Sequence, residues 1–534
     1  MPRKKKNNMR RKQGNNVRRK QEHTMPSTKK EDSMNIQTTS EGTAQTETPA
    51  ADATVTETPA VDATVPPLGE ILELFHTPQR EGYATIGVNS HRETWALDSK
   101  EFRQLREQYY YVLNGTMPSQ KTLKEELRIL EGKARFEGPE LPVHLRIAEL
   151  EDRLYLDLAN PAWEVVEITA QGWRVIDNPP VKFRRPSSMC ALPHPLPGGT
   201  IEELRSLVNI GSEDDWRLLV SFLVSTFRPQ GPYPVLVLHG PQGAAKSTVT
   251  KLVRALIDPN HAPIRKVPQS ERDLFISATQ GWVLAFDNLS ALSSEASDAF
   301  CRLTTGGSFV TRKLYTDGDE AIFQATRAVI INGIEEVVIR GDLLDRSLLL
   351  HLPTLSPTQR REDDQVWVMF EDARPRILGA LLDAVSAVLR NRDTVTLTER
   401  PRMADFARWA CAAAPALGWT AEQFLQAYTD NIESANDLVL EASPVAQAVL
   451  TLMEHQHFWE DTPTQLLAVL TPWLESMPAS ERPRSAQTLS NKLRRLAPNL
   501  SKAGVQIIFD GRRPGGNRDR LITLERVINH DQES

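Results

Sequence analysis

The chain has 534 residues, of which 40% are hydrophobic and 25% are charged, and its formal net charge is −6. At about 100–200 residues per domain, this length indicates about three domains and some unstructured chain. The only cysteines, Cys190, Cys301 and Cys411, lie far apart with no CxxC spacing, which argues against a disulfide scaffold, a zinc ribbon or an iron–sulfur site.

Targeting and membrane signals are also missing from the sequence. The longest apolar run, near Leu218–Phe227, is too short to span a bilayer and has polar breaks. The N-terminus is basic but lacks the apolar stretch of a secretory signal. We therefore expect a soluble cytoplasmic protein that does not bind membranes.

The small net charge is the sum of two opposite parts. Residues 1–30 contain twelve Lys and Arg residues and one acid, Glu22, which leaves 51 bases and 68 acids in the rest of the chain. A ten-residue repeat of small and polar residues follows at 46–65. Such a composition buries too little apolar area to fold, so we expect residues 1–67 to be a disordered basic arm and linker. The arm can attract DNA, or it can serve only solubility.

Residues 68–195 predict an α+β domain. The apolar positions of 99–113 and 119–133 have helical spacing, and Ser119 is placed to cap the second helix. Short turns then separate four predicted strands, at 153–159, 163–169, 172–177 and 181–185. We expect these strands to form a small antiparallel sheet.

The next region, 196–355, contains the strongest motif. Helices are predicted at 201–208 and 214–227, and the apolar run 235–238 (VLVL) predicts a strand buried on both faces. The loop GPQGAAKST follows, and the helical pattern of 250–257 comes next. A strand, a glycine-rich loop and a helix in this order are the context of a Walker A motif.

Such a loop binds phosphates with its backbone N–H groups and with the positive end of the helix that follows. Lys246 would contact the β- and γ-phosphates of ATP, and the hydroxyl of Ser247 would bind Mg²⁺. The predicted ATP-binding residues are Gly240, Pro241, Gln242, Gly243, Ala244, Ala245, Lys246, Ser247 and Thr248. The alternative is a glycine turn that happens to precede a lysine.

Ala245 departs from the motif, which has glycine at this position. If the backbone there needs a positive φ, alanine costs on the order of 1 kcal/mol. Because alanine adds only a methyl group, we still expect the loop to close.

Two further strands would bring polar residues to the same edge of a sheet. Asp287 ends the apolar segment 281–288, where a Walker B carboxylate would hold Mg²⁺. Asn288 follows at a position where many such ATPases carry a second acid, and asparagine can orient water but is a poor base. Asn332 ends the strand predicted at 327–334, where it would contact the γ-phosphate or the attacking water, or else form a β-turn with Gly333.

Arg346 precedes another apolar strand, in LLDRSLLLHLP (343–353). It is placed to reach the nucleotide of a neighbouring subunit and stabilise transition-state charge. A local ion pair with Asp342 or Asp345 is the alternative.

The order of GPQGAAKST, VLAFDN, GGSFVTRKLYT, VIINGI and LLDRSLLLHL resembles superfamily 3 helicases, in particular the AAA+-like ATPases of phage and plasmid primase–helicases. This resemblance is strong over 196–355 and loose over 68–195. It implies Walker A roles for Lys246 and Ser247, a Walker B role for Asp287, a sensor role for Asn332 and an arginine finger at Arg346. It also implies a hexameric ring on single-stranded DNA. Because no primase site precedes the ATPase, a separate primase or polymerase would be a partner.

Asp317-Gly318 is a tight-turn signal between two strand-like segments, and it predicts a β-hairpin. In the helicases that the chain resembles, a hairpin here carries basic residues to DNA. In this chain the tip is acidic, so Arg312 or Lys313 on the strand would make the contact. A solvated hairpin face is the alternative.

The C-terminal part divides into a predicted helical lid, 356–440, and a predicted winged-helix domain, 441–534. Helices at 444–454, 463–475 and 485–497 precede two strands, 505–509 and 521–527, joined by an arginine-rich loop. The third helix and the loop concentrate the basic residues that phosphate contact needs. The predicted DNA-binding residues here are Lys492, Arg494, Arg495, Arg512, Arg513, Arg518 and Arg520. A winged helix can also bind protein.

The sequence therefore predicts a P-loop NTPase core of AAA+-like type, with an α+β domain before it and a helical lid and winged helix after it. The leading hypothesis is an ATPase that uses ATP and Mg²⁺ to move along or unwind DNA, as a replication protein of a phage, plasmid or other mobile element. The rival is a nucleotide-gated switch or loader that remodels a protein partner without unwinding DNA. A small-molecule kinase ranks third, because the predicted sensor and finger have no natural role in it.

Overall fold

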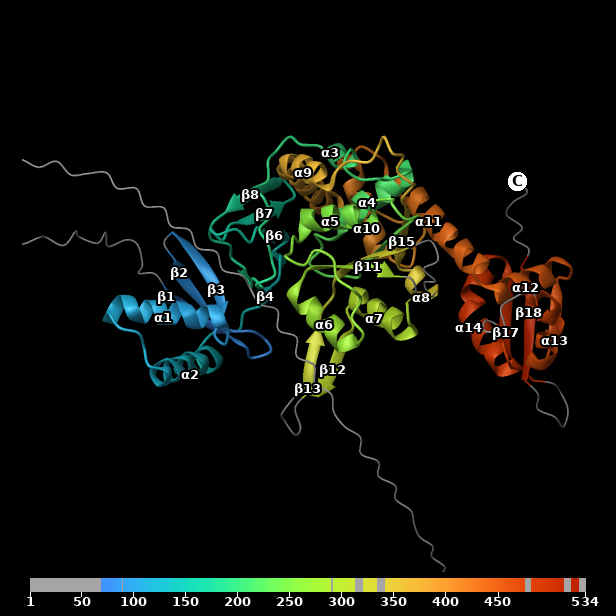
Figure 1. Ribbon diagram of the computed structural model, residues 1–534, viewed down its shortest axis with the longest axis horizontal. Coiled ribbons are helices and arrows are strands. Elements are labelled where there is room, and N and C mark those ends of the chain that lie inside the picture. The colour runs from blue at the N-terminus through green and yellow to red at the C-terminus, as the bar shows by residue number, and fades with distance from the viewer. Residues whose placement is uncertain are drawn as a thin grey trace, which may run out of the picture. The chain divides into compact units, whose positions relative to one another are not determined.

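The structure is a computed structural model that describes residues 69–88, 90–289, 292–312, 320–333, 341–475, 482–512 and 520–527 (Figure 1). The chain divides into two units, Met1–Asp62 and Ala63–Ser534, and all the described residues belong to the second. The predicted arm and linker, 1–67, lie outside the described residues. Among the described helices, none is long and apolar enough to cross a membrane. The described chain is a mixed α/β structure with several sheets.

An antiparallel sheet begins the described chain, with strands β1 (Glu70–His76), β2 (Gly82–Val88) and β3 (His91–Ala96) in that order. Helices α1 (Lys100–Asn114) and α2 (Gln120–Phe136) pack on it, and the side chains of Ser99 and Ser119 cap them by accepting from backbone N–H groups. Both predicted helices are confirmed. The sheet was not predicted, because all residues of β2 are buried and the strand lacks a polar alternation.

The antiparallel sheet predicted from the next segments has the order β5-β6-β7-β8. Its strands are β5 (Ile147–Leu150), β6 (Arg153–Asp157), β7 (Val165–Thr169) and β8 (Gly172–Ile176). The prediction for 181–185 was wrong in one respect. β9 (Lys182–Phe183) is only two residues long and pairs in parallel with β4 (Val143–His144), outside this sheet. The register of so short a strand is set by a distant partner, which local sequence does not reveal.

A parallel sheet with the order β11-β14-β10-β15 forms the centre of the region after residue 200. Its strands are β10 (Val235–His239), β11 (Val283–Leu289), β14 (Ala328–Gly333) and β15 (Ser347–His351). Each strand coincides with an apolar segment that was predicted from the sequence. Parallel strands covered on both faces read as continuous apolar runs, which explains why these four could be predicted.

Two separate hydrophobic clusters show how helices cover the sheet. Leu236 and Leu238 of β10 belong to a cluster with α4 (Glu213–Ser225), α5 (Lys246–Ile257), α9 (Asp363–Asn391) and α10 (Ala404–Ala413). Val235 and Val237 of the same strand belong to a second cluster with α6 (Glu271–Gln280), α7 (Ser294–Thr305) and α8 (Gly341–Leu344). Because successive strand residues point to opposite faces, the sheet is a central layer between two groups of helices.

Three further predictions concern this region. The predicted hairpin is present as β12 (Ser308–Arg312) paired antiparallel with β13 (Glu320–Gln324), and its tip lies outside the described residues. The helix predicted at 201–208 is only one turn, α3 (Glu202–Arg205), and no side chain caps its start. The predicted helical region contains α9, α10, the 3₁₀ turn η1 (Ala414–Leu417) and α11 (Ala421–Glu441).

The C-terminal part has its own hydrophobic core between three helices and a three-stranded sheet. The helices are α12 (Pro444–Glu454), α13 (Pro463–Leu474) and α14 (Ala486–Lys502), and the sheet order is β16-β18-β17. β17 (Val505–Arg512) and β18 (Arg520–Arg526) were predicted, whereas β16 (Phe458–Asp461) was not. The third helix does not end at 497 as predicted, because α14 continues through Pro498.

Candidate nucleotide and DNA sites

The glycine-rich loop joins the end of β10 to the start of α5. A side chain at Gly240 is excluded sterically, because its Cβ would lie 2.3 Å from the carbonyl oxygen of Leu352. Gly243 has φ +83°. Ala245 has φ +61° and ψ +24°, the left-handed conformation that its position was expected to require. The loop is therefore formed with alanine in place of the motif's glycine, at a local backbone cost.

Lys246 and Ser247 begin α5 and face different partners. The Lys246 Nζ donates to the carbonyl oxygens of Gly240 at 2.7 Å and of Pro241 at 2.8 Å. The Ser247 hydroxyl donates to a carboxylate oxygen of Asp287 at 3.1 Å. The structure thus brings together the ammonium, hydroxyl and carboxylate that the sequence predicted for one site.

Asn332 lies in the same sheet, next to β10. It is 1% exposed and pairs in register with Leu238, two residues before the loop. Its side-chain amide donates to the hydroxyl of Thr250 on α5 at 3.2 Å. Since Asn332 lies within β14, it is a strand residue rather than a turn residue. Its sensor role stays a prediction.

Arg346 is half-buried between α8 and β15. Within the described part of the chain, neither proposed local ion pair forms. Asp345 instead pairs with Arg402 and Lys502, at 2.9 Å in both cases. The Arg346 Nε has no hydrogen-bond partner. The Arg346 guanidinium therefore forms neither of the two local salt bridges. Its contact with the nucleotide of a neighbouring subunit stays a prediction.

Several predicted residues cannot be placed. The side chains of Asn288 and Arg312 lie outside what the structure describes, as do Lys313, Arg512, Arg513 and Arg518.

Of the remaining predicted DNA-binding residues, three are exposed: Arg494 and Arg495 on α14, and Arg520 at the start of β18. Lys492 is half-buried. The Arg494 guanidinium lies over the ring of Phe509 on β17, 4.8 Å from its centroid.

Sequence reasoning missed two residues beside the loop. Asn209 donates from its side-chain amide to the carbonyl oxygens of Ala244 at 3.0 Å and Pro353 at 2.7 Å, which ties the loop to the chain after β15. The Arg360 guanidinium lies 3.7 Å from the position that a Cβ on Gly243 would take. Neither belongs to a motif, and both reach the loop only through the fold, so no local signal marked them.

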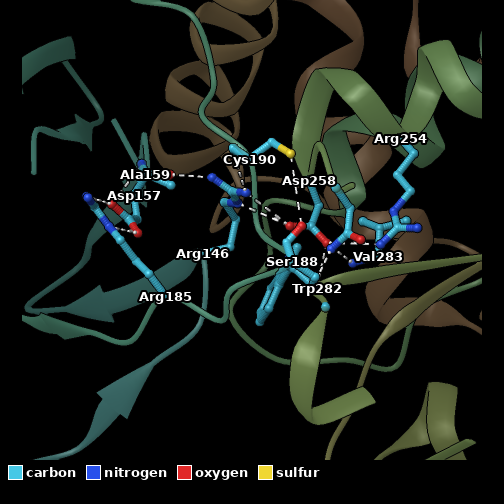
Figure 2. A network of polar contacts seen from close by, with 12 residues as sticks. Arg146, Asp157, Ala159, Arg185, Ser188, Cys190, Arg254, Asp258, Trp282 and Val283 are labelled. Atoms are coloured by element: carbon cyan, nitrogen blue, oxygen red, sulfur yellow. Dashed lines mark hydrogen bonds and ion pairs between the residues drawn. The ribbon is translucent and has the colours of Figure 1, made fainter. Parts of the chain in front are cut away.

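A buried polar network anchors the far end of α5, as Figure 2 shows. The Arg146 guanidinium donates to Asp258 at 3.2 Å, and also to the backbone oxygens of Asp157 and Cys190, both at 3.0 Å. Arg146 and Asp258 are both 0% exposed. The second carboxylate oxygen of Asp258 accepts from the backbone N–H groups of Trp282 at 2.8 Å and of Val283, the first residue of β11, at 3.2 Å.

This network has a consequence for the loop. Asp258 follows the last residue of α5, whose first residue is Lys246, and it also binds the start of the strand that carries Asp287. The two elements that supply Ser247 and Asp287 are therefore fixed to each other and to the β5–β8 segment. Burial also lowers the pKa of Arg254 on α5 to about 10.

The carboxyl of Asp215 has a pKa above its ordinary value. Burial raises the pKa of Asp215 on α4 to about 6, against the opposing effects of a hydrogen bond from Ser212 and of His351 at the end of β15.

Two parts of the chain are similar to known protein families. Residues 201–438 match the family described as actinomycete integrative conjugative element replication protein, and residues 445–533 match the AICE RepA C-terminal domain. No curated protein sequence matches the chain.

Two similar solved structures are apo forms of the NrS-1 C-terminal region, at 10% and 12% identity. Each alignment covers 85% of this chain and 96% of that chain, with a TM-score of 0.38. A TM-score this low does not establish a shared fold. The two family matches carry the identity: the chain is a replication protein of a mobile element, similar over these ranges to the replication proteins of actinomycete integrative conjugative elements.

Proposed function

We propose that this replication protein is an ATP-dependent DNA helicase or translocase of the superfamily 3 type. The observation that carries the proposal is the hydrogen bond between Ser247 and Asp287, next to a glycine-rich loop and Lys246. A hydroxyl and a carboxylate on neighbouring elements are the oxygen donors that Mg²⁺ prefers. With the loop amides beside them, these residues fit a magnesium–nucleotide complex.

Each residue then has a defined task. Loop residues 240–245 would hold the phosphates through backbone N–H groups, and Lys246 would leave the carbonyls of Gly240 and Pro241 to contact the β- and γ-phosphates. Ser247 and Asp287 would hold Mg²⁺, which neutralises phosphate charge when bound. Asn332, fixed by Thr250, would orient the attacking water, and Asn288 is the second candidate for that role.

Two arginines would complete the charge stabilisation. Arg346 has no ion pair in the described part of the chain, which suits an arginine that acts across a subunit interface in a hexameric ring. Arg360, which lies against Gly243, would contact phosphate within the same subunit. Both would contribute because transition-state charge spreads over several phosphate oxygens.

The C-terminal part would bind DNA as a winged helix. Its three helices, its three-stranded sheet and the exposed Arg494, Arg495 and Arg520 support this reading. The basic arm and the β12–β13 hairpin would add further DNA contacts, with Arg312 and Lys313 on or next to the hairpin strand.

Nucleotide binding tests the first half of the proposal. Lys246→Ala should weaken the binding of a fluorescent ATP analogue at least tenfold, whereas Lys251→Ala, on the same helix but away from the loop, should not. Asp287→Asn should shift the binding to higher Mg²⁺ concentrations. Equal affinity of wild type and Lys246→Ala would contradict the nucleotide site.

Strand separation tests the second half. Wild-type protein with ATP should unwind a forked duplex, and Lys246→Ala should not. ATP turnover by wild type without any unwinding would favour the rival, a switch or loader acting on a protein partner.

A further inference from the structure

A second candidate site lies between the end of α9 and the start of α10, far along the chain from the glycine-rich loop. The connecting segment and the two helix ends line an open cavity of about 280 Å³. Three arginines line it, Arg392, Arg400 and Arg408, together with the hydroxyl-bearing Thr396 and a single acid, Asp393. The lining therefore has a formal charge of +2.

The three arginines differ in how they are held. Arg392 donates to Asp152 in the β5–β6 turn at 2.7 Å and lies 3.6 Å from Glu149 of β5, so two acids hold it. Arg400 and Arg408 are exposed. Within the described ranges, neither of them forms an ion pair. Val395 and Leu397, which also line the cavity, pack against the main hydrophobic cluster and hold the segment in place.

Arg400 and Arg408 share the cavity with the acid Asp393, but within the described chain neither forms an ion pair with it. Their like charges repel one another, and an anionic ligand would relieve that repulsion. The chain beyond residue 30 is acidic, with 51 bases against 68 acids. Two arginines without an ion pair therefore stand out from the rest of the chain. A planar guanidinium matches the oxygens of a phosphate in a two-point hydrogen bond.

We propose that the α9–α10 cavity binds a backbone phosphate of single-stranded DNA. The chain is a replication protein, and a phosphodiester strand presents repeated anions of the kind that two neighbouring arginines can hold. This site is separate from the winged-helix, hairpin and arm contacts. It rests on the DNA-binding part of the proposed function but not on the nucleotide site.

Arginine footprinting of the full chain tests the proposal directly. The chain is treated with phenylglyoxal with and without a thirty-nucleotide oligothymidylate, and the modification of each arginine is followed by mass spectrometry. DNA should slow the modification of Arg400 and Arg408 severalfold. Arg128, which is exposed on α2, should react equally in both cases.

A matched pair of double variants gives the second readout. Arg400→Gln with Arg408→Gln removes the two unpaired cavity charges, whereas Arg103→Gln with Arg128→Gln removes two exposed charges from α1 and α2. Because each phosphate contact contributes about 0.7 to the salt slope for single strands, and the cavity holds one phosphate, the cavity variant should lower the slope of log affinity against log salt by about 0.7. The control variant should keep the wild-type slope, and equal thermal unfolding of both variants shows that each is folded.

The outcomes separate the two proposals. If the chain binds the oligothymidylate but Arg400 and Arg408 are not protected, the cavity proposal is wrong and the proposed function stands. Protection by polyglutamate but not by DNA, at equal ionic strength, would also overturn it in favour of an acidic peptide. If the chain binds no DNA at all, the proposed function fails as well.

Discussion

Ala245 is the residue at which the loop differs most from the Walker A pattern. Its left-handed backbone, with φ +61°, is unfavourable for any residue with a Cβ, by roughly 1–2 kcal/mol. Glycine would remove this strain but would lose more entropy on folding. Replacing Ala245 by glycine therefore measures the strain in the loop.

We expect Ala245→Gly to raise the free energy of unfolding by about 1 kcal/mol. Ala244→Gly is the matched control, because Ala244 is buried beside it without a positive φ and should be destabilised by a similar amount. Urea unfolding of both variants checks the prediction. A loss of stability in Ala245→Gly would show that the loop is not strained at this residue.

Asp215 gives a prediction about pH. Its folded pKa of about 6 lies above the ordinary 3.8, so folding favours the protonated carboxyl. This contribution is fully present below about pH 4 and is lost as the pH rises through about 6. Relative to Asp215→Asn, wild type should lose stability on the order of 1 kcal/mol per pH unit between pH 4 and 6. Parallel stability curves for the two proteins over this range would refute the raised pKa.

At the scale of elements, the buried pair Arg146–Asp258 joins α5, β11 and the β5–β8 segment. Removing one partner of a buried pair costs about 3–5 kcal/mol. After the loss of Arg146, Asp258 would keep Arg254 at the long distance of 3.9 Å, and the backbone oxygens of Asp157 and Cys190 would lose their donor. A pair at the surface contributes about 0–1 kcal/mol. The two costs can be compared within this chain.

Arg146→Met should lower the unfolding midpoint in urea strongly, and it should also weaken ATP binding because the ends of α5 and β11 lose their common anchor. Arg153→Met is the control. The Arg153 side chain is 48% exposed, and its partner Glu167 keeps Arg174, so little change is expected. Equal midpoints for the two variants would mean that the buried network does not hold the elements together.

The elements also show what local sequence can and cannot predict. The unit β10–loop–α5 was predictable because the apolar run, the glycines and the helical spacing are contiguous. Strand β16 was missed because FWED has only four residues, two aromatic and then two acidic, without strand alternation. It becomes a strand by pairing with β18, more than sixty residues away. Asn209 and Arg360 were missed for the same reason, since each reaches the loop from a distant segment.

At the scale of the molecule, charge is distributed by segment rather than evenly. The basic arm, the exposed arginines of α14 and β18 and the α9–α10 cavity are basic within a chain that is otherwise acidic. The glycine-rich loop and its partners belong to the range that matches the replication protein family, and the α14 and β18 arginines belong to the range that matches its C-terminal domain. Nucleotide turnover at the loop should therefore respond to DNA held at these basic segments.

ATP hydrolysis measured with and without single-stranded DNA tests this response most directly. The full chain should hydrolyse ATP slowly alone and at least several-fold faster with saturating oligothymidylate, and Lys246→Ala should hydrolyse ATP in neither case. Equal turnover with and without DNA, or turnover that survives Lys246→Ala, would contradict the account.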